Sequence, residues 1–438
     1  MKKNQKMTKL QMTGIEQKTF SGFSLLYTLL LLTLLTMLLT SFITLFFISK
    51  KQSLELITRS AAERDVYSAM TLLRDPSFEL HSDEPVTISL YDGTDDSVIC
   101  YRNHWGFFGL IRASVERKNY RFSAVALYGD YCHSEDLQAL LLGNCYKPLC
   151  ICGNTILKGN FKVAKAGIKA SSISGRYYEG PNNLVDGTVE TDDHKMPAIK
   201  PYYLLLQPKY QINSPQRYSQ IIKYGLSSFS DTLINSFHNK TIILCAENGV
   251  VLDGCFLQGN VMVLSDSSIL LKKSALINDI IICAKKIMFE PGFKGTGQFI
   301  ASDSLRCGPW CTFPYPSSLA VIHTGSGPAP FLLLDKMCRL DGSVICYSDK
   351  SPKPHTAILQ INKDCMITGS VYSNQLISLS GKVFGNIMIP GFLLKTPISI
   401  YENFLLDVVI DYTRQPQYYC GIRYNENESI LKIIKWLQ

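Results

Sequence analysis

The sequence is poor in the residue patterns that build metal and cofactor sites. It has only 7 histidines in 438 residues, and they are scattered singly along the chain: His81, His104, His133, His194, His238, His323 and His355. The closest cysteine pairs are Cys150 with Cys152 and Cys307 with Cys311. A structural zinc site would need a second pair or histidines close by. We therefore expect neither a metal nor a cofactor.

Catalytic motifs and a basic stripe are also missing. Serine, histidine and aspartate can be combined into a triad in almost any long chain, so their presence alone identifies no active site. The net charge of +8 is spread over the sequence and is not interleaved with aromatic residues on one segment. That distribution argues against nucleic acid as a partner. The sequence thus predicts no catalytic residue and no nucleic-acid interface.

The 14 cysteines would suggest disulfides if the chain is exported. Several of them lie inside apolar runs that are typical of strands, where a thiol behaves as a small hydrophobic side chain. These are Cys100, Cys245, Cys283 and Cys346. We therefore predict that most cysteines belong to the core.

Charged side chains are absent from residues 19–49. About 20 apolar residues suffice to cross a bilayer as a helix, so this stretch predicts a single transmembrane helix with the membrane lipid bilayer as its partner. A buried core helix of this length would normally show a polar face. A secretory signal would have a shorter apolar core followed by a small-residue cleavage site. Both alternatives are weaker than a retained membrane anchor.

A basic leader, residues 1–18, precedes this helix and contains Lys2, Lys3, Lys6, Lys9 and Lys18. Basic residues also follow the helix, so the positive-inside rule only leans towards a cytoplasmic N-terminus. Gly22-Phe23, placed after the leader and before the apolar helix, resembles the processing site of type IV prepilins and minor pseudopilin-like proteins. In that family a peptidase cuts after the glycine. Tyr27 stands at the fifth position after the cut, where the family usually has glutamate.

Helical periodicity continues beyond the membrane over residues 50–75, with apolar residues at three- and four-residue steps. Residues 76–148 then switch to period two, which predicts a small antiparallel sheet. A helical stalk lying on such a sheet is also the layout of pilin-like domains. Any anchored protein with a stalk and a small β domain would give the same pattern.

Residues 149–395 consist of short apolar runs punctuated by glycine, asparagine and aspartate. Runs beginning at Val261, Ile280 and Gln298 align at steps of about 19 and 18 residues. Leu376 aligns with Ala357 at a step of about 19, or with Ile358 at about 18. This spacing predicts a parallel β-helix, or β-solenoid, and its glycine-rich final turns resemble bactofilin-like polymer-forming β-helices. A β-sandwich is the alternative.

Two segments depart from the repeat. Residues 186–240 are rich in Tyr, Ser, Pro and Gln, which predicts an insertion that leaves the solenoid. Residues 396–438 resemble a C-terminal cap with a strand, a turn at Gln415-Pro416 and a short amphipathic helix that ends near Trp436. The expected fold is therefore mainly β: a transmembrane helix, a stalk, a small antiparallel sheet, a β-solenoid with an insertion, and a cap.

This organisation predicts a non-enzymatic, membrane-anchored structural or assembly protein. Its solenoid would contact envelope proteins or other copies of the chain, in the cell envelope or in a pilus- or secretion-like machine, with most of the chain in the periplasm. The alternative is a membrane-displayed carbohydrate-active enzyme, a polysaccharide lyase or hydrolase on a β-helix. Its candidate residues would be Asp253, Asp279, Lys285, Lys286, Asp303 and Arg306.

Overall fold

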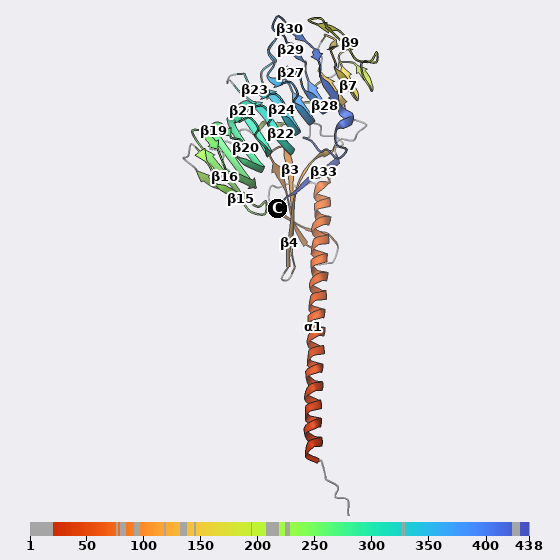
Figure 1. Cartoon of the computed structure of the whole chain (residues 1–438), viewed down its shortest axis with the longest axis vertical. Coiled ribbons are helices and arrows are strands. Elements are labelled where there is room, and N and C mark those ends of the chain that lie inside the picture. Colours follow the sequence, from red (N-terminus) through yellow and green to blue (C-terminus); the bar gives the residue numbers. More distant parts are fainter. Residues whose placement is uncertain are drawn as a thin grey trace, which may run out of the picture. The chain divides into compact units, whose positions relative to one another are not determined.

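A computed structural model of the chain describes residues 21–75, 78, 85–91, 97–117, 120–131, 138–143, 146–193, 195–206, 219–223, 228–325, 327, 329–422 and 430–437. By their internal contacts, Met1–Glu63 and Arg64–Gln438 form two separate units. The protein is mostly β, with one long N-terminal helix and a large parallel sheet (Figure 1). The predicted leader lies outside the described residues.

Helix α1 runs from Ser21 to Arg74 and is long and apolar enough to cross a membrane, with a mean hydropathy of 2.4 in its most apolar part. In its apolar part the hydroxyls of Thr33, Thr36 and Thr40 need no water, because each donates to a backbone carbonyl one turn earlier at 2.9 Å. The helix ends shortly before Pro76, whose ring disfavours helical geometry in the preceding residue.

The unit that begins at Arg64 contains a five-stranded antiparallel sheet in the order β1-β2-β3-β4-β33. Its strands are β1 (Val86–Ser89), β2 (Ser97–Trp105), β3 (Phe108–Arg117), β4 (Tyr120–Tyr131) and β33 (Ile430–Leu437). The predicted C-terminal amphipathic helix was wrong, because these residues form β33 on the edge of β4. Over eight residues, an apolar pattern cannot distinguish a helix from a strand.

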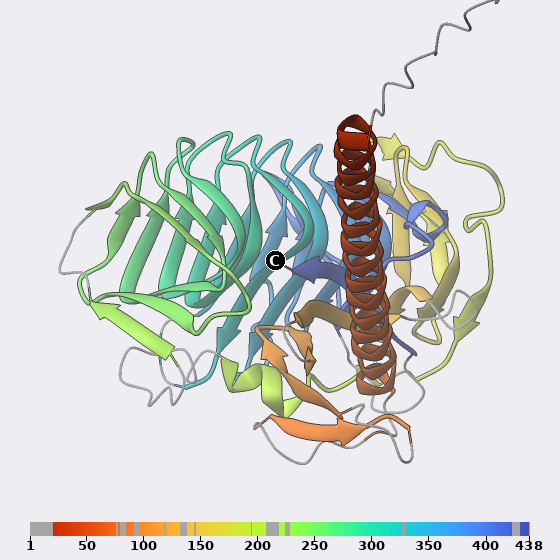
Figure 2. The same ribbon diagram turned by 90° about the horizontal axis from the view of Figure 1, so that it is seen from below.

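The same unit contains the large parallel sheet, whose strands lie side by side in Figure 2. Its strands are β5 (Gln138–Leu142), β7 (Ile156–Lys158), β8 (Asn160–Val163), β12 (Val189–Thr191), β13 (Ser219–Lys223), β14 (Ser228–Phe229), β15 (Thr232–Asn235), β16 (Thr241–Ala246), β17 (Val250–Leu252), β18 (Phe256–Gly259), β19 (Val261–Leu271), β20 (Leu276–Phe289), β21 (Gly295–Cys307), β22 (Thr312–His323), β23 (Phe331–Leu334), β24 (Arg339–Ser348), β25 (Leu359–Ile361), β26 (Met366–Ser373), β27 (Ile377–Leu379), β28 (Lys382–Ile389) and β32 (Val409–Asp411).

Short elements complete the described part of the chain. A small parallel sheet has the order β31-β6-β9, and two antiparallel pairs are β10 with β11 and β29 with β30. Their bounds are β6 (Leu149–Cys152), β9 (Ile168–Ala170), β10 (Ser172–Ile173), β11 (Arg176–Tyr177), β29 (Leu393–Lys395), β30 (Ile400–Glu402) and β31 (Phe404–Leu406), with helices α2 (Pro201–Leu204) and η1 (Tyr412–Arg414).

One continuous row of paired strands runs through the parallel sheet in the order β13-β16-β19-β20-β21-β22-β24-β26-β28-β5-β8-β12. Met262 pairs with Ile281 and Leu359 with Ile377, in agreement with the repeats aligned from the sequence. Ile280 pairs with Gly297, one residue from the predicted partner Gln298. A one-residue error of this kind reverses the face assigned to every side chain of a strand.

The order of strands in this row differs from their order in the chain. β5 pairs with β28, so the sheet's first strand lies beside one of its last strands, and β8 and β12 continue outwards from it. The next strand in sequence, β13, lies at the opposite end of the row. The connection between β12 and β13 therefore links the two ends of the row.

Three predicted boundaries need correction. Residues 186–240 are not simply an insertion, because β12, β13, β14 and β15 all pair in parallel with other strands of the sheet. Residues 396–438 are not a terminal cap, because β32 pairs with both β28 and β7. The predicted antiparallel range, residues 76–148, is too long, because β5 at its end belongs to the parallel sheet. The errors at β5 and β32 arise because β5 pairs with β28 and β32 with β7, strands that are far away in sequence.

Two hydrophobic cores follow from the alternation of side chains along these strands. One face of the parallel sheet contributes Val263, Ile282, Phe299, Leu319 and Val344 to the larger core. The opposite face contributes Met262, Ile281, Ile300, Ile345 and Tyr372 to a second core, which also contains Trp105, Phe107, Val125, Leu127 and Tyr203 from the antiparallel sheet and the α2 region. The antiparallel sheet therefore packs on the outer face of the parallel sheet.

Candidate interaction surface

The acidic residues proposed for a carbohydrate-active enzyme have separate partners. Asp253 accepts hydrogen bonds from Lys272 at 2.8 Å and from Ser274 at 2.6 Å, and these bonds lower the pKa of its carboxyl. Asp279 binds the Lys435 ammonium at 2.6 and 2.8 Å. This pair ties β33 to β20 of the parallel sheet, so Asp279 has a structural contact.

The basic candidates are only partly brought together with the acids. Lys285 and Lys286 lie at the bend of β20 that faces Ser302 and Asp303 on β21. Arg306 instead lies over the Phe331 ring, 5.1 Å from its centroid. The six candidates thus do not gather around one point where a substrate could sit.

A serine, a histidine and an aspartate do meet at this bend. Sequence reasoning named Asp303 as a candidate but did not place Ser302 and His323 beside it. His323 is buried, and its Nδ1 lies 3.0 Å from the Ser302 carbonyl oxygen and 3.9 Å from Asp303 Oδ1. The Ser302 hydroxyl donates to Asp303 at 3.1 Å. A triad requires the serine hydroxyl to donate to the histidine, which then takes its proton. The arrangement therefore lacks the relay of a nucleophilic serine.

The described residues that could ligate a metal ion do not form a cluster. Within the described ranges, no group of three or more His, Cys, Asp or Glu residues is arranged to hold a metal ion. All twelve described cysteines are buried free thiols, as expected for core residues. Cys150 and Cys152 lie together in β6, where burial raises the pKa of both thiols.

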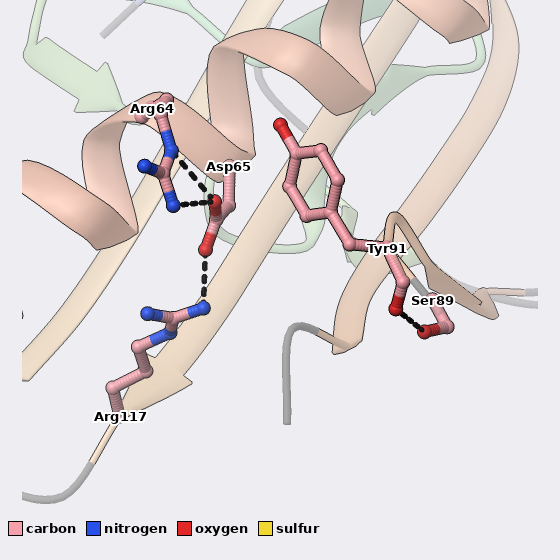
Figure 3. A network of polar contacts seen from close by, with 5 residues as sticks. All are labelled: Arg64, Asp65, Ser89, Tyr91 and Arg117. Carbon is pink, nitrogen blue, oxygen red and sulfur yellow. Dashed lines mark hydrogen bonds and ion pairs between the residues drawn. The ribbon is translucent and has the colours of Figure 1, made fainter. Parts of the chain in front are cut away.

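The end of helix α1 is fixed to the antiparallel sheet by a buried carboxylate (Figure 3). Asp65 is fully buried and forms an ion pair with Arg117 at the end of β3, while Arg64 lies 3.4 Å from its other oxygen. The Tyr67 ring packs nearby against Phe122 and Trp436. A buried carboxylate is costly unless it is paired, so this ion pair specifies where the helix docks.

The two ends of the strand row are open. In the part of the chain that the structure describes, no strand pairs with the outer edge of β12 or of β13. Unpaired strand edges present backbone donors and acceptors that can pair with another chain. Both edges are therefore candidate interaction surfaces.

The outer strand at the β12 end carries exposed acidic side chains. Glu190 lies 3.1 Å from Lys162 of the preceding strand, and two further pairs, Lys158 with Asp186 and Lys165 with Asp193, lie at 3.4 and 3.0 Å. Each acidic side chain is at least half exposed. This surface would attract a strand that carries basic residues at the matching positions.

The register connects this acidic end with a basic residue at the other end. Glu190 pairs with Lys162, and the same column of residues continues through the whole row to Cys245 and Lys223. The neighbouring column runs in the same way from Val189 to Ile222. If a second copy continued the row in the same register, Glu190 would be the register partner of Lys223, and Val189 that of Ile222.

Gly22 and Phe23, the predicted cleavage site, lie in the first turn of helix α1, and Phe23 is 75% exposed. Cleavage between them stays a prediction.

Comparisons with protein-family models, with curated proteins and with solved structures found no match to this chain.

Proposed function

We propose that this is a non-enzymatic, membrane-anchored structural protein whose parallel sheet is a β-solenoid that associates with other copies or with envelope proteins through its open ends. The observation that carries the proposal is the register of the strand row, in which Glu190 and Lys223 occupy the same column at opposite ends. Strand edges that match in both polarity and charge favour end-to-end stacking.

The pairing offsets support the solenoid. Met262 pairs with Ile281 and Phe256 with Leu276, so equivalent positions recur after about one turn of chain in different parts of the same sheet. Each turn contributes apolar residues to one shared core, which no single turn could form alone. A β-sandwich would require mainly antiparallel pairing between its strands.

The long apolar helix α1 supports the proposal that the chain is anchored in the membrane by its N-terminal part. The end of helix α1 docks on an antiparallel sheet through Asp65 and Arg117, which is the layout of pilin-like domains. We therefore retain the type IV pilin-like and bactofilin-like resemblances as parts of this proposal. We place the N-terminus in the cytoplasm and the bulk of the chain in the periplasm.

A carbohydrate-active enzyme has less support. Asp253 and Asp279 are each held by a lysine that belongs to a different part of the chain, and Asp303 faces a buried histidine. General acid-base chemistry at a glycosidic bond needs two carboxyl groups that flank the same bond.

Charge reversal tests the end-to-end contact. We expect the full-length chain, purified in detergent, to form concentration-dependent oligomers in sedimentation velocity. Glu190→Lys should weaken the association about tenfold, because an attractive cross-strand pair becomes repulsive. The double variant Glu190→Lys with Lys223→Glu should restore it, since the exchanged charges again face each other.

Glu116→Lys provides the control, because this exposed glutamate lies on the β3–β4 hairpin and pairs with Arg121. It should leave the association constant unchanged. A chain that stays monomeric at every concentration, or a double variant that is no better than Glu190→Lys, would refute stacking through these ends.

A further inference from the structure

Cysteines recur at one corner of the parallel sheet, where the chain turns from one strand to the next. Cys311, Cys338 and Cys365 occupy the same position in three successive turns. Arg339 N donates to the Cys311 carbonyl and Met366 N to the Cys338 carbonyl, both at 2.8 Å. The neighbouring register pairs Thr312 with Arg339 and Arg339 with Met366, so the three cysteines are aligned.

The three side chains lie in the larger core, with Cys338 between the other two. All are buried, and the Cys338 thiol lies within hydrogen-bonding reach of the thiols of Cys311 and Cys365. Paired parallel strands are about 4.8 Å apart, which lies within the Cα separation of about 4.4–6.8 Å that a disulfide spans. Cys311 and Cys365 are two turns apart, roughly twice that spacing, and cannot reach each other.

We propose that Cys338 forms a disulfide with either Cys311 or Cys365 that staples two neighbouring turns of the parallel sheet when the chain folds in the presence of an oxidant. The cysteine at the centre of the three is then the indispensable partner. Either outer cysteine alone suffices.

The position of these thiols explains what the bond would do. Cys338 is 27 residues from each outer cysteine, whereas the preceding turns at this corner, from Cys255 through Ala275 and Phe293 to Cys311, are 18 to 20 residues long. Longer turns contain more loop, and a cross-link between them removes more freedom from the unfolded chain. A link at this corner would therefore close a slightly longer loop than a link between the preceding turns.

The oxidation is a thiol–disulfide exchange with an external disulfide, either a small molecule or a dithiol oxidoreductase. One cysteine thiolate attacks the external disulfide and releases one external thiol, and the second thiolate then attacks the mixed disulfide and releases the other. Two protein S–H bonds are lost, one S–S bond forms, and the external disulfide is reduced to two thiols. The hydrogen bond with the Cys311 thiol first, and then burial, raise the pKa of Cys338 to about 12, so the exchange must take place before this corner is fully packed.

Oxidative refolding of the full-length chain tests the proposal. Because the Cys307 thiol also lies near Cys338 and Cys365, all variants carry Cys307→Ala. The chain is unfolded in urea with reductant, refolded into detergent with a mixture of oxidised and reduced glutathione, alkylated and digested. Mass spectrometry should find Cys338 linked to Cys311 or Cys365. Cys311→Ala and Cys365→Ala should each retain one link, and Cys338→Ala should lose both.

Cys255→Ala is the matched control, since Cys255 has the same corner position but is followed in the next turn by Ala275. Cys255→Ala should keep the link. In reductant its thermal unfolding should resemble that of Cys338→Ala. The comparison then separates the effect of a lost disulfide from the effect of lost packing. Refolded chains in which Cys338 is fully alkylated would overturn the proposal, as would a link between Cys311 and Cys365 in the Cys338→Ala variant.

Discussion

The parallel and antiparallel sheets of the same unit are held together by different interactions. In the parallel sheet the same residue type recurs at one position in neighbouring strands, as with Gly342, Gly369 and Gly385. In the antiparallel sheet the decisive contact occurs once, between Asp65 on helix α1 and Arg117 on β3. The parallel sheet depends on backbone geometry that repeats from strand to strand, whereas the docking of helix α1 on the antiparallel sheet involves one pair of charges.

This difference predicts how each region responds to substitution. In the glycine column, a Cβ on Gly369 would overlap with the Gly342 carbonyl oxygen, and a Cβ on Gly385 would overlap with the Gly369 carbonyl oxygen. These neighbours are backbone atoms, so they cannot move without breaking strand pairing. Asp65 and Arg117 contact each other through their side chains, so both partners of this contact can be replaced together.

The largest effect should come from Gly369→Ala. Gly369 has a φ of 141°, which disfavours a side chain, and the added Cβ would also meet the backbone of the neighbouring strand. We expect a loss of about 4 kcal/mol or more in the free energy of unfolding, measured by urea titration in detergent. Gly175→Ala is the control, because its φ is 79° but the space around it is open. It should lose only about 1–2 kcal/mol, and equal losses in both variants would refute the steric argument.

A smaller effect is expected from Asp65→Asn. This change removes the buried negative charge that faces the Arg117 guanidinium, and we expect a loss of about 2–4 kcal/mol in the free energy of unfolding. The double variant Asp65→Leu with Arg117→Met should recover most of this loss, because both charges of the pair are then removed together. A double variant as unstable as Asp65→Asn would show that apolar side chains cannot replace the pair.

The sequence predicts individual helices and strands better than it predicts which strands pair. The helix was predictable because residues 19–49 carry no charge, and the strands at Val261 and Ile280 because apolar runs repeat at turn spacing. The neighbours of β5 and β33 were not predictable. β5 pairs with β28 and β33 pairs with β4, and nothing in the local pattern of a strand specifies a partner hundreds of residues away.

The candidate surfaces were even less accessible from sequence. The predicted solenoid implied two ends but not which strands form them. Residues 186–240 lacked the repeat signal because the short strands β12, β14 and β15 contain mostly polar or exposed residues. The ion pair between Asp279 and Lys435 was equally hidden, so Asp279 looked like a candidate catalytic carboxylate. The cysteine column could have been found from the recurrence of cysteine at 27-residue steps in Cys311, Cys338 and Cys365.

The smallest effect concerns the contact between the two sheets at His238. Its Nδ1 lies 3.0 Å from Ser123 Oγ on β4, and its backbone carbonyl accepts from Arg112 on β3. Burial first, and then the Arg112 charge, lower the pKa of His238 in the folded protein. The unfolded chain therefore binds the proton more readily, so His238 contributes stability above its ordinary pKa of about 6.5 that is lost as the pH falls. Urea titrations at about pH 7.5 and about pH 5.5 should show this loss, and His238→Asn should reduce it. Arg112→Met should also reduce it, since one cause of the lowered pKa is removed, whereas an unchanged pH dependence in both variants would exclude His238 as its source.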